Sequence, residues 1–163
     1  MISEIEKNQS LFLKNVLQIR KKIAPNNSFL ISNEIDNFIE KNGAKKDGNT
    51  ITITHNVTIE NGEQVLDLEM MIPLNKEIEP FQEYNFLSEF SLNNALKVRI
   101  EGNPQQMQNA VQRMSEYVKN ENLNVTTPLY VVTIKESKTN ADIDYMITEL
   151  YIGVKWIIFI SYR

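Results

Sequence analysis

Apolar and polar residues follow two periodicities along the chain, and these separate predicted strands from predicted helices. Residues 10–23 alternate loosely, which predicts a strand that is bulged or begins as a short helix. Residues 28–42 place apolar side chains at helical spacing. Residues 51–60 and 66–73 return to alternation, and Asn61-Gly62 between them is typical of a tight hairpin turn. The first half therefore predicts a strand, a helix and two further strands.

The two strands of this hairpin are each expected to present one apolar face. Asp67, Glu69 and Met71 lie opposite that face in the returning strand. His55, the only histidine, falls among the apolar positions of the preceding strand. We expect a structural role for it, because the sequence supplies neither catalytic partners nor a set of metal donors around it. The apolar positions are Ile51, Ile53, Val57 and Ile59 in the first strand and Leu66, Leu68, Met70 and Ile72 in the second.

The second half repeats this organisation after a linker at residues 75–88. Residues 90–100 are strand-like, and residues 104–122 carry an apolar stripe at helical spacing. Residues 129–134 and 143–154 then predict two strands joined by a polar turn. The last strands of the two halves, LEMMIPL and TELYIGV, also resemble each other. A repeat at this scale predicts a duplicated architecture.

The final strand has one apolar and one mixed face. Met146, Leu150, Ile152 and Val154 share the apolar parity, with Thr148 as its polar member. The other parity holds Tyr145, Ile147, Glu149 and Tyr151, which places a carboxylate between aromatic and aliphatic neighbours. This mixed face is the first candidate for a functional surface.

Composition narrows the class of protein. The chain has 163 residues, is 42% hydrophobic and 23% charged, carries a net charge of −4 and lacks cysteine. One globular domain is expected, and thiol chemistry is excluded. The charge argues against a nucleic-acid surface, which needs a basic face. No apolar run reaches the length of a bilayer span and the first residues lack a signal-peptide pattern, so we expect a cytoplasmic protein without membrane contact.

Two short motifs resemble the GyrI-like (gyrase-inhibitor-like) effector-binding domain. Residues 127–132, TPLYVV, resemble that family's Gly-Pro, aliphatic, Tyr, Glu, aliphatic, Tyr pattern, and residues 148–153, TELYIG, resemble its closing Thr-Glu-Leu-x-Ile-Pro. The likeness implies an α+β fold: duplicated β-α-β-β units with pseudo-twofold symmetry, an antiparallel sheet and two main helices. The implied domain spans residues 1–163, with unit one at about 11–74, unit two at about 90–154 and an apolar tail at 155–163.

The resemblance also implies a ligand site, because family members bind small, often cationic, organic molecules in a cleft. One family carboxylate is retained as Glu149, whereas the other is replaced by Val131. A buried cation needs a compensating charge, so the loss favours a neutral or monocationic amphipathic ligand over a dication. The ligand-binding candidates are Glu149, Tyr151, Val131, Thr133, Glu69 and Met71. No metal, cofactor or catalytic residue is expected.

Several alternatives stay open at this stage. Glu149 is equally explained as a strand residue paired with a lysine, and the tyrosines as packing residues. Three functions are considered: a stand-alone effector-binding protein, an interaction protein with a vestigial cleft, and a hydrolase. The hydrolase is less favoured, because Val131 stands where the family has the carboxylate that would be the best candidate base. No DNA-binding helical region precedes the domain, so we expect no direct contact with nucleic acid.

The tail at residues 155–163 is the last expectation. It reads KWIIFISYR, and its apolar residues exceed what the resembling domain needs. Apolar residues on both parities favour a strand covered on both faces. We expect either coverage of the chain's own sheet edge or strand addition to a protein partner or a second copy, and favour the latter.

Overall fold

A computed structural model describes residues 1–157, apart from the side chain of Asn140. Ile158, Phe159 and Ile160 of the predicted tail therefore lie outside the described residues. The helices and strands are β1 (Glu6–Ile23), α1 (Ser28–Lys41), β2 (Ile51–Glu60), β3 (Glu63–Pro73), β4 (Tyr84–Glu101), α2 (Met107–Asn120), β5 (Leu123–Lys135) and β6 (Ile147–Trp156). Short 3-10 helices occupy Pro25–Asn27, Pro104–Gln106 and Asn140–Tyr145.

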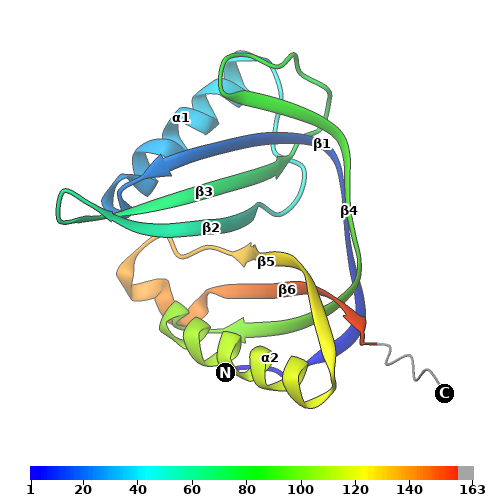
Figure 1. Ribbon diagram of the computed structural model, residues 1–163. Coiled ribbons are helices and arrows are strands. Elements are labelled where there is room, and N and C mark those ends of the chain that lie inside the picture. The colour runs from blue at the N-terminus through cyan, green and yellow to red at the C-terminus, as the bar shows by residue number, and fades with distance from the viewer. Residues whose placement is uncertain (158–163) are drawn as a thin grey trace. The chain divides into compact units, whose positions relative to one another are not determined.

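The chain divides into two compact units, and each has the predicted strand-helix-strand-strand order. The first unit is Leu11–Ser91, in which β3 pairs antiparallel with both β1 and β2 beside α1 (Figure 1). The second unit joins Met1–Ser10 to the chain from Leu92 onwards. In it β6 pairs antiparallel with both β4 and β5, beside α2 (Figure 1). The α+β class, with duplicated units, antiparallel strands and two main helices, is confirmed.

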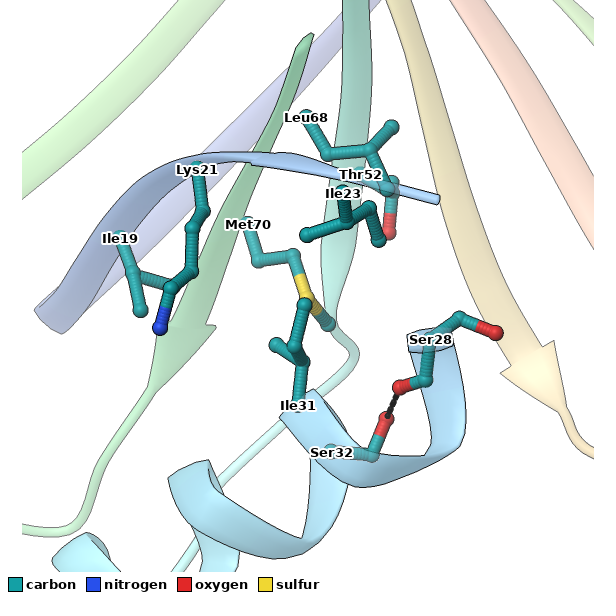
Figure 2. Close-up of a pocket in the computed structure, with 9 residues that line it drawn as sticks. All are labelled: Ile19, Lys21, Ile23, Ser28, Ile31, Ser32, Thr52, Leu68 and Met70. Carbon is teal, nitrogen blue, oxygen red and sulfur yellow. Dashed lines mark hydrogen bonds between the residues drawn. The ribbon is translucent and has the colours of Figure 1, made fainter. Parts of the chain in front are cut away.

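Each helix packs on one face of its own unit's strands. In the first unit Ile31, Ile35 and Ile39 of α1 are buried in a cluster with β1 and β3. In the second unit Ala110 and Met114 of α2 are buried against β4, β5 and β6. Full burial of an aliphatic side chain contributes about 1.5–3 kcal/mol, so these stripes hold the helices in place. Close to the start of α1 the first cluster leaves a pocket (Figure 2).

The hairpin between β2 and β3 has the predicted turn. Asn61 and Gly62 adopt φ values of 51° and 80°, the left-handed pair that a type I′ turn requires. The predicted face of β2, by contrast, is wrong beyond Ile53. A bulge between Thr54 and Asn56 shifts the register, so Val57 pairs with Leu66 on the helix side.

Several element boundaries also differ from the structure. Asn140–Tyr145 is a 3-10 helix, so the last strand begins at Ile147 and extends to Trp156. The predicted linker is partly strand, since β4 already begins at Tyr84. Met1–Ser10, which sequence reasoning left unassigned, belongs to the second unit, where Ile2 bridges to Ile100.

Candidate functional site

The strand register of the second unit places Glu149 on the face that lies opposite α2. Glu149 pairs directly with Arg99 of β4 and with Val132 of β5. Directly paired residues project to the same face of an antiparallel sheet. Tyr151 is likewise paired, with Lys97 on one side and with a tyrosine of β5 on the other. The face therefore brings one carboxylate, two bases and aromatic rings together.

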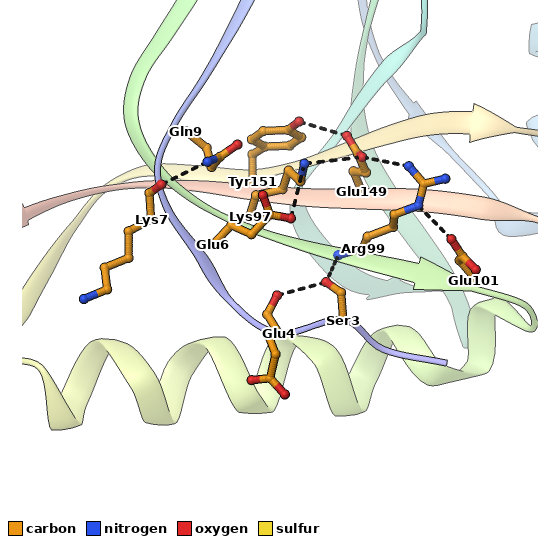
Figure 3. Close-up of polar contacts among 10 residues, drawn as sticks. All are labelled: Ser3, Glu4, Glu6, Lys7, Gln9, Lys97, Arg99, Glu101, Glu149 and Tyr151. Atoms are coloured by element: carbon orange, nitrogen blue, oxygen red, sulfur yellow. Dashed lines mark hydrogen bonds and ion pairs between the residues drawn. The ribbon is translucent and has the colours of Figure 1, made fainter.

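Glu149 is buried, and both of its oxygens have polar neighbours (Figure 3). Its residue is 8% exposed, and Tyr151 is 6% exposed. The Tyr151 hydroxyl donates a hydrogen bond of 2.8 Å to Glu149 Oε2. On the other oxygen, Arg99 Nη1 lies 3.3 Å and Lys97 Nζ 3.7 Å from Oε1. The structure therefore shows Glu149 paired with bases, as in the alternative interpretation from the sequence.

Both bases have a second carboxylate at shorter distance. Arg99 Nε lies 3.0 Å from Glu101 Oε1, and Lys97 Nζ lies 3.4 Å from Glu6 Oε1 (Figure 3). The side chains of Glu6 and Glu101 are about half exposed, whereas that of Glu149 is 11% exposed. Glu149 Oε1 therefore has the longer contacts, to two bases that each have a nearer carboxylate, whereas Oε2 accepts the hydrogen bond from the phenol.

Two pKa directions follow from this arrangement. Burial, with the hydrogen bond to Glu149 as a second cause, raises the pKa of Tyr151 well above its ordinary value. The phenol therefore stays neutral and remains a donor at physiological pH. The hydrogen bond to Glu101, ahead of that to Glu149, raises the pKa of Arg99. The ion pairs on this face form one row of alternating charges, in the order Glu101, Arg99, Glu149, Lys97 and Glu6.

The first unit has a carboxylate at the matching strand position. Glu69 pairs with Arg20 and with Ile53, as Glu149 pairs with Arg99 and Val132. Its oxygens accept from Gln18 Nε2 at 2.5 Å and contact His55 Nε2 at 2.7 Å. His55 lies two residues after Ile53, which pairs with Glu69, so the histidine projects to the Glu69 face and has a polar partner there that sequence reasoning did not predict.

The predicted site residues do not all lie on these two faces. Glu149 and Tyr151 share one face of the second unit, and Glu69 and Met71 share the matching face of the first. Val131 pairs with Leu150 and packs against the α2 cluster, and Thr133 pairs with Thr148 on that same helix side. The structure therefore does not bring these two residues together with Glu149.

Sequence reasoning missed Lys97 and Arg99. The signal available was the apolar parity of residues 90–100, because Leu96, Val98 and Ile100 leave Lys97 and Arg99 on the opposite face. Parity alone could not reveal which strand lies beside β6. The register between β4 and β6 supplied that information.

The predicted tail begins inside β6, since Lys155 and Trp156 are the last two residues of that strand. Trp156 pairs with Leu123 at the end of β6, and the Ile157 amide donates to the Asn122 carbonyl oxygen at 3.1 Å. Trp156 is nevertheless 59% exposed. Along residues 1–157 no group of acidic or histidine side chains is suited to a metal ion. No helix in that range has the length and apolar character needed for a membrane crossing.

Known structures share this arrangement. The EcmrR chain in the EcmrR–DNA complex superposes over 96% of this chain with a TM-score of 0.75 at 15% identity. The crystal structure of the EcmrR C-terminal domain superposes over 92% of this chain and 99% of its own, with a TM-score of 0.68 at 15% identity. The chain therefore shares its fold with the EcmrR C-terminal domain.

The similarity to EcmrR covers only part of that protein's length. This chain spans 58% of the EcmrR chain in the DNA complex. A hydrolase from Listeria innocua is also similar, over 91% of this chain and 92% of its own, with a TM-score of 0.57 at 12% identity. No protein-family model and no curated protein sequence matches the chain. At these identities the comparisons describe the fold.

Proposed function

We propose that this chain is a GyrI-like effector-binding protein of the cytoplasm that binds a small amphipathic molecule, either neutral or singly charged and cationic. Its fold is that of the EcmrR C-terminal domain, which supports a ligand-binding role by analogy. Glu149 and Tyr151 of the second unit are the proposed polar anchors for the ligand.

One observation carries this proposal. Glu149 is a buried carboxylate whose Oε1 has only long contacts, of 3.3 Å and 3.7 Å, to bases that have nearer partners. A cationic group of a ligand takes over Oε1 while Arg99 stays with Glu101 and Lys97 with Glu6. The exchange replaces one charge-assisted contact by another, so it leaves no buried charge without a partner. A dication finds no second free carboxylate in this cluster.

Binding of a matched pair of probes tests the proposal. We expect tetraphenylphosphonium, a lipophilic monocation, to bind the full chain in isothermal titration calorimetry. Glu149→Gln is expected to weaken it by about 1–3 kcal/mol, the order of the Coulomb attraction between a partly buried carboxylate and a cation without hydrogen-bond donors, and to leave neutral triphenylphosphine oxide nearly unchanged. Glu116→Gln, on the exposed surface of α2, is the control and should change neither.

Two outcomes contradict the proposal. If both probes lose equal affinity in Glu149→Gln, the substitution has damaged packing and the carboxylate is not a charge anchor. If neither probe binds the unsubstituted chain, this ligand class is wrong.

A protein-interaction role is the second candidate, and the exposed Trp156 favours it. A tryptophan that is 59% exposed at the end of a strand is a typical anchor for a protein partner or a second copy of the chain. Deleting residues 156–163 and measuring the mass in solution tests this role. A larger assembly that the deletion reduces to monomer supports it. A monomer before and after, with lower stability after, shows that the tail serves its own domain.

A further inference from the structure

The first unit contains a pocket that the proposed function does not use. It lies between the first turns of α1 and the strands of that unit, and its volume is about 140 Å³ (Figure 2). The side chains of Ile31 from α1 and Met70 from β3 point toward one another across it (Figure 2). Its apolar lining is Ile19, Ile23, Ile31, Leu68 and Met70.

The start of α1 explains why the pocket is open. The helix turns Ile31 into the core, but its neighbours Phe29 and Leu30 are 72% and 58% exposed and do not fill the space. An unfilled apolar space forfeits dispersion contacts and destabilises the fold. An apolar guest of suitable size recovers those contacts. Cavities of about 150 Å³ lined by aliphatic side chains bind benzene, so this pocket has the size for a single ring.

The polar groups at the pocket select against charge. The Lys21 ammonium is already bound to Glu83 at 2.8 Å, with Glu34 at 3.6 Å. The Ser32 hydroxyl donates to the Ser28 carbonyl oxygen at 3.2 Å (Figure 2), which leaves the lone pairs of Ser32 Oγ to accept. Ser28 and Thr52 also line the pocket, so the lining offers hydroxyl oxygens as acceptors and no unpaired charge.

We propose that this pocket binds a neutral, single-ring aromatic molecule with one O–H or N–H donor, which is directed at Ser32 Oγ. Phenol is the simplest example. The site lies wholly within the first unit and is independent of Glu149. Its ligand is uncharged, in contrast to the cation that Glu149 would hold.

Methyl NMR of the full chain, labelled at methionine and isoleucine, tests the site with phenol and benzene as probes. We expect saturable shifts of the Met70 and Ile31 methyl signals. Ser32→Leu, an exposed helix position at the pocket, should weaken both probes at least about tenfold by occupying the space. Ser32→Ala should weaken phenol by about threefold to tenfold, the effect of one neutral hydrogen bond, and leave benzene unchanged.

The second unit supplies a matched control. Ser115 of α2 lines a pocket of about 180 Å³ with Met114 and Leu129, so Ser115→Leu makes the same change on the other helix. It should leave the shifts at Met70 and Ile31 unaltered. The proposal is overturned if these shifts are absent or do not saturate, if Ser32→Leu leaves them intact, or if Ser115→Leu removes them. Equal losses of phenol and benzene in Ser32→Ala would overturn the assigned hydrogen bond.

Discussion

The hydrogen bond between Tyr151 and Glu149 should contribute measurably to folding stability. The hydroxyl lies 2.8 Å from Oε2, and both residues are buried. A hydrogen bond to a charged group contributes about 1.5–3 kcal/mol, about twice the contribution of a neutral one. Tyr151→Phe removes the donor and should reduce the free energy of unfolding by about 2 kcal/mol. Glu149→Gln keeps an acceptor and should cost about 1 kcal/mol, because Arg99 and Lys97 retain Glu101 and Glu6 as partners.

A double-mutant cycle of Tyr151→Phe and Glu149→Gln, measured by urea unfolding, isolates the charge-dependent part of this contact, because the glutamine keeps a neutral acceptor. The two losses should not add, and we expect a coupling free energy of about 1 kcal/mol. Tyr145→Phe is the control, because Tyr145 is 64% exposed and its change should stay within about 0.5 kcal/mol. The reasoning is refuted if the coupling is zero and Tyr151→Phe costs no more than the control. The bases would then hold Glu149 without help from the phenol.

The burial of Tyr151, with the same hydrogen bond as a second cause, raises its pKa and predicts that stability depends on alkaline pH. The folded-state pKa of Tyr151 is raised above the unfolded value, so its contribution is fully present below pH of about 10. That contribution is lost as the pH rises through the folded-state pKa. Unfolding free energies measured between neutral pH and pH of about 11 should therefore fall more in the unsubstituted chain than in Tyr151→Phe. Parallel pH profiles for the two proteins would contradict this assignment.

Three further substitutions test the register and the packing. Val131→Glu places a carboxylate against the α2 cluster, so urea unfolding should show a loss of about 2–4 kcal/mol in the free energy of unfolding, and cations should not bind more tightly. Tighter binding of cations would refute the assignment of Val131 to the helix side of β5. Gly153→Ala brings a Cβ to 2.6 Å from Thr127 Cγ2, so calorimetry should show a loss of about 1–3 kcal/mol in the free energy of unfolding. An unchanged melting temperature would mean that the bulge in β5 moves to accommodate the added methyl group at no cost. The hydrogen bond from Arg20 lowers the pKa of Asp67, so the contribution of Asp67 to stability is present above its ordinary pKa and is lost as pH falls through the lowered pKa. The free energy of unfolding of Asp67→Asn should therefore fall less steeply with acid than that of the unsubstituted chain. Identical profiles would exclude the Arg20–Asp67 pair as a source of acid sensitivity.

The local periodicities of the sequence determined the elements of this fold. The apolar stripes at helical spacing predicted α1 and α2, and Asn61-Gly62 predicted the hairpin turn. Alternation also assigned the faces of β3 and β6, since Leu68 of β3 and Leu150 of β6 pack in the helix-side clusters of their units. These features are local, because helix and strand periodicity depend on neighbours within a few residues.

The partners across strands were decided by the tertiary structure alone. Nothing near Glu149 in sequence indicates that Arg99 lies beside it, because cross-strand register joins residues that are far apart in the chain. A single bulge in β2 moved Val57 to the helix side, and an unbroken alternating pattern cannot predict such a shift.

Gly153 shows the same division between local and tertiary information. In the sequence it stands where the resembling motif has proline. In the structure its amide donates to Thr127 Oγ1 at 2.8 Å, and a Cβ at this position would meet the Thr127 side chain. The local sequence thus determined the two helices, the existence of the strands and the faces of β3 and β6. The pairing of those strands decided which charges meet, because that depends on contacts the chain makes only when folded.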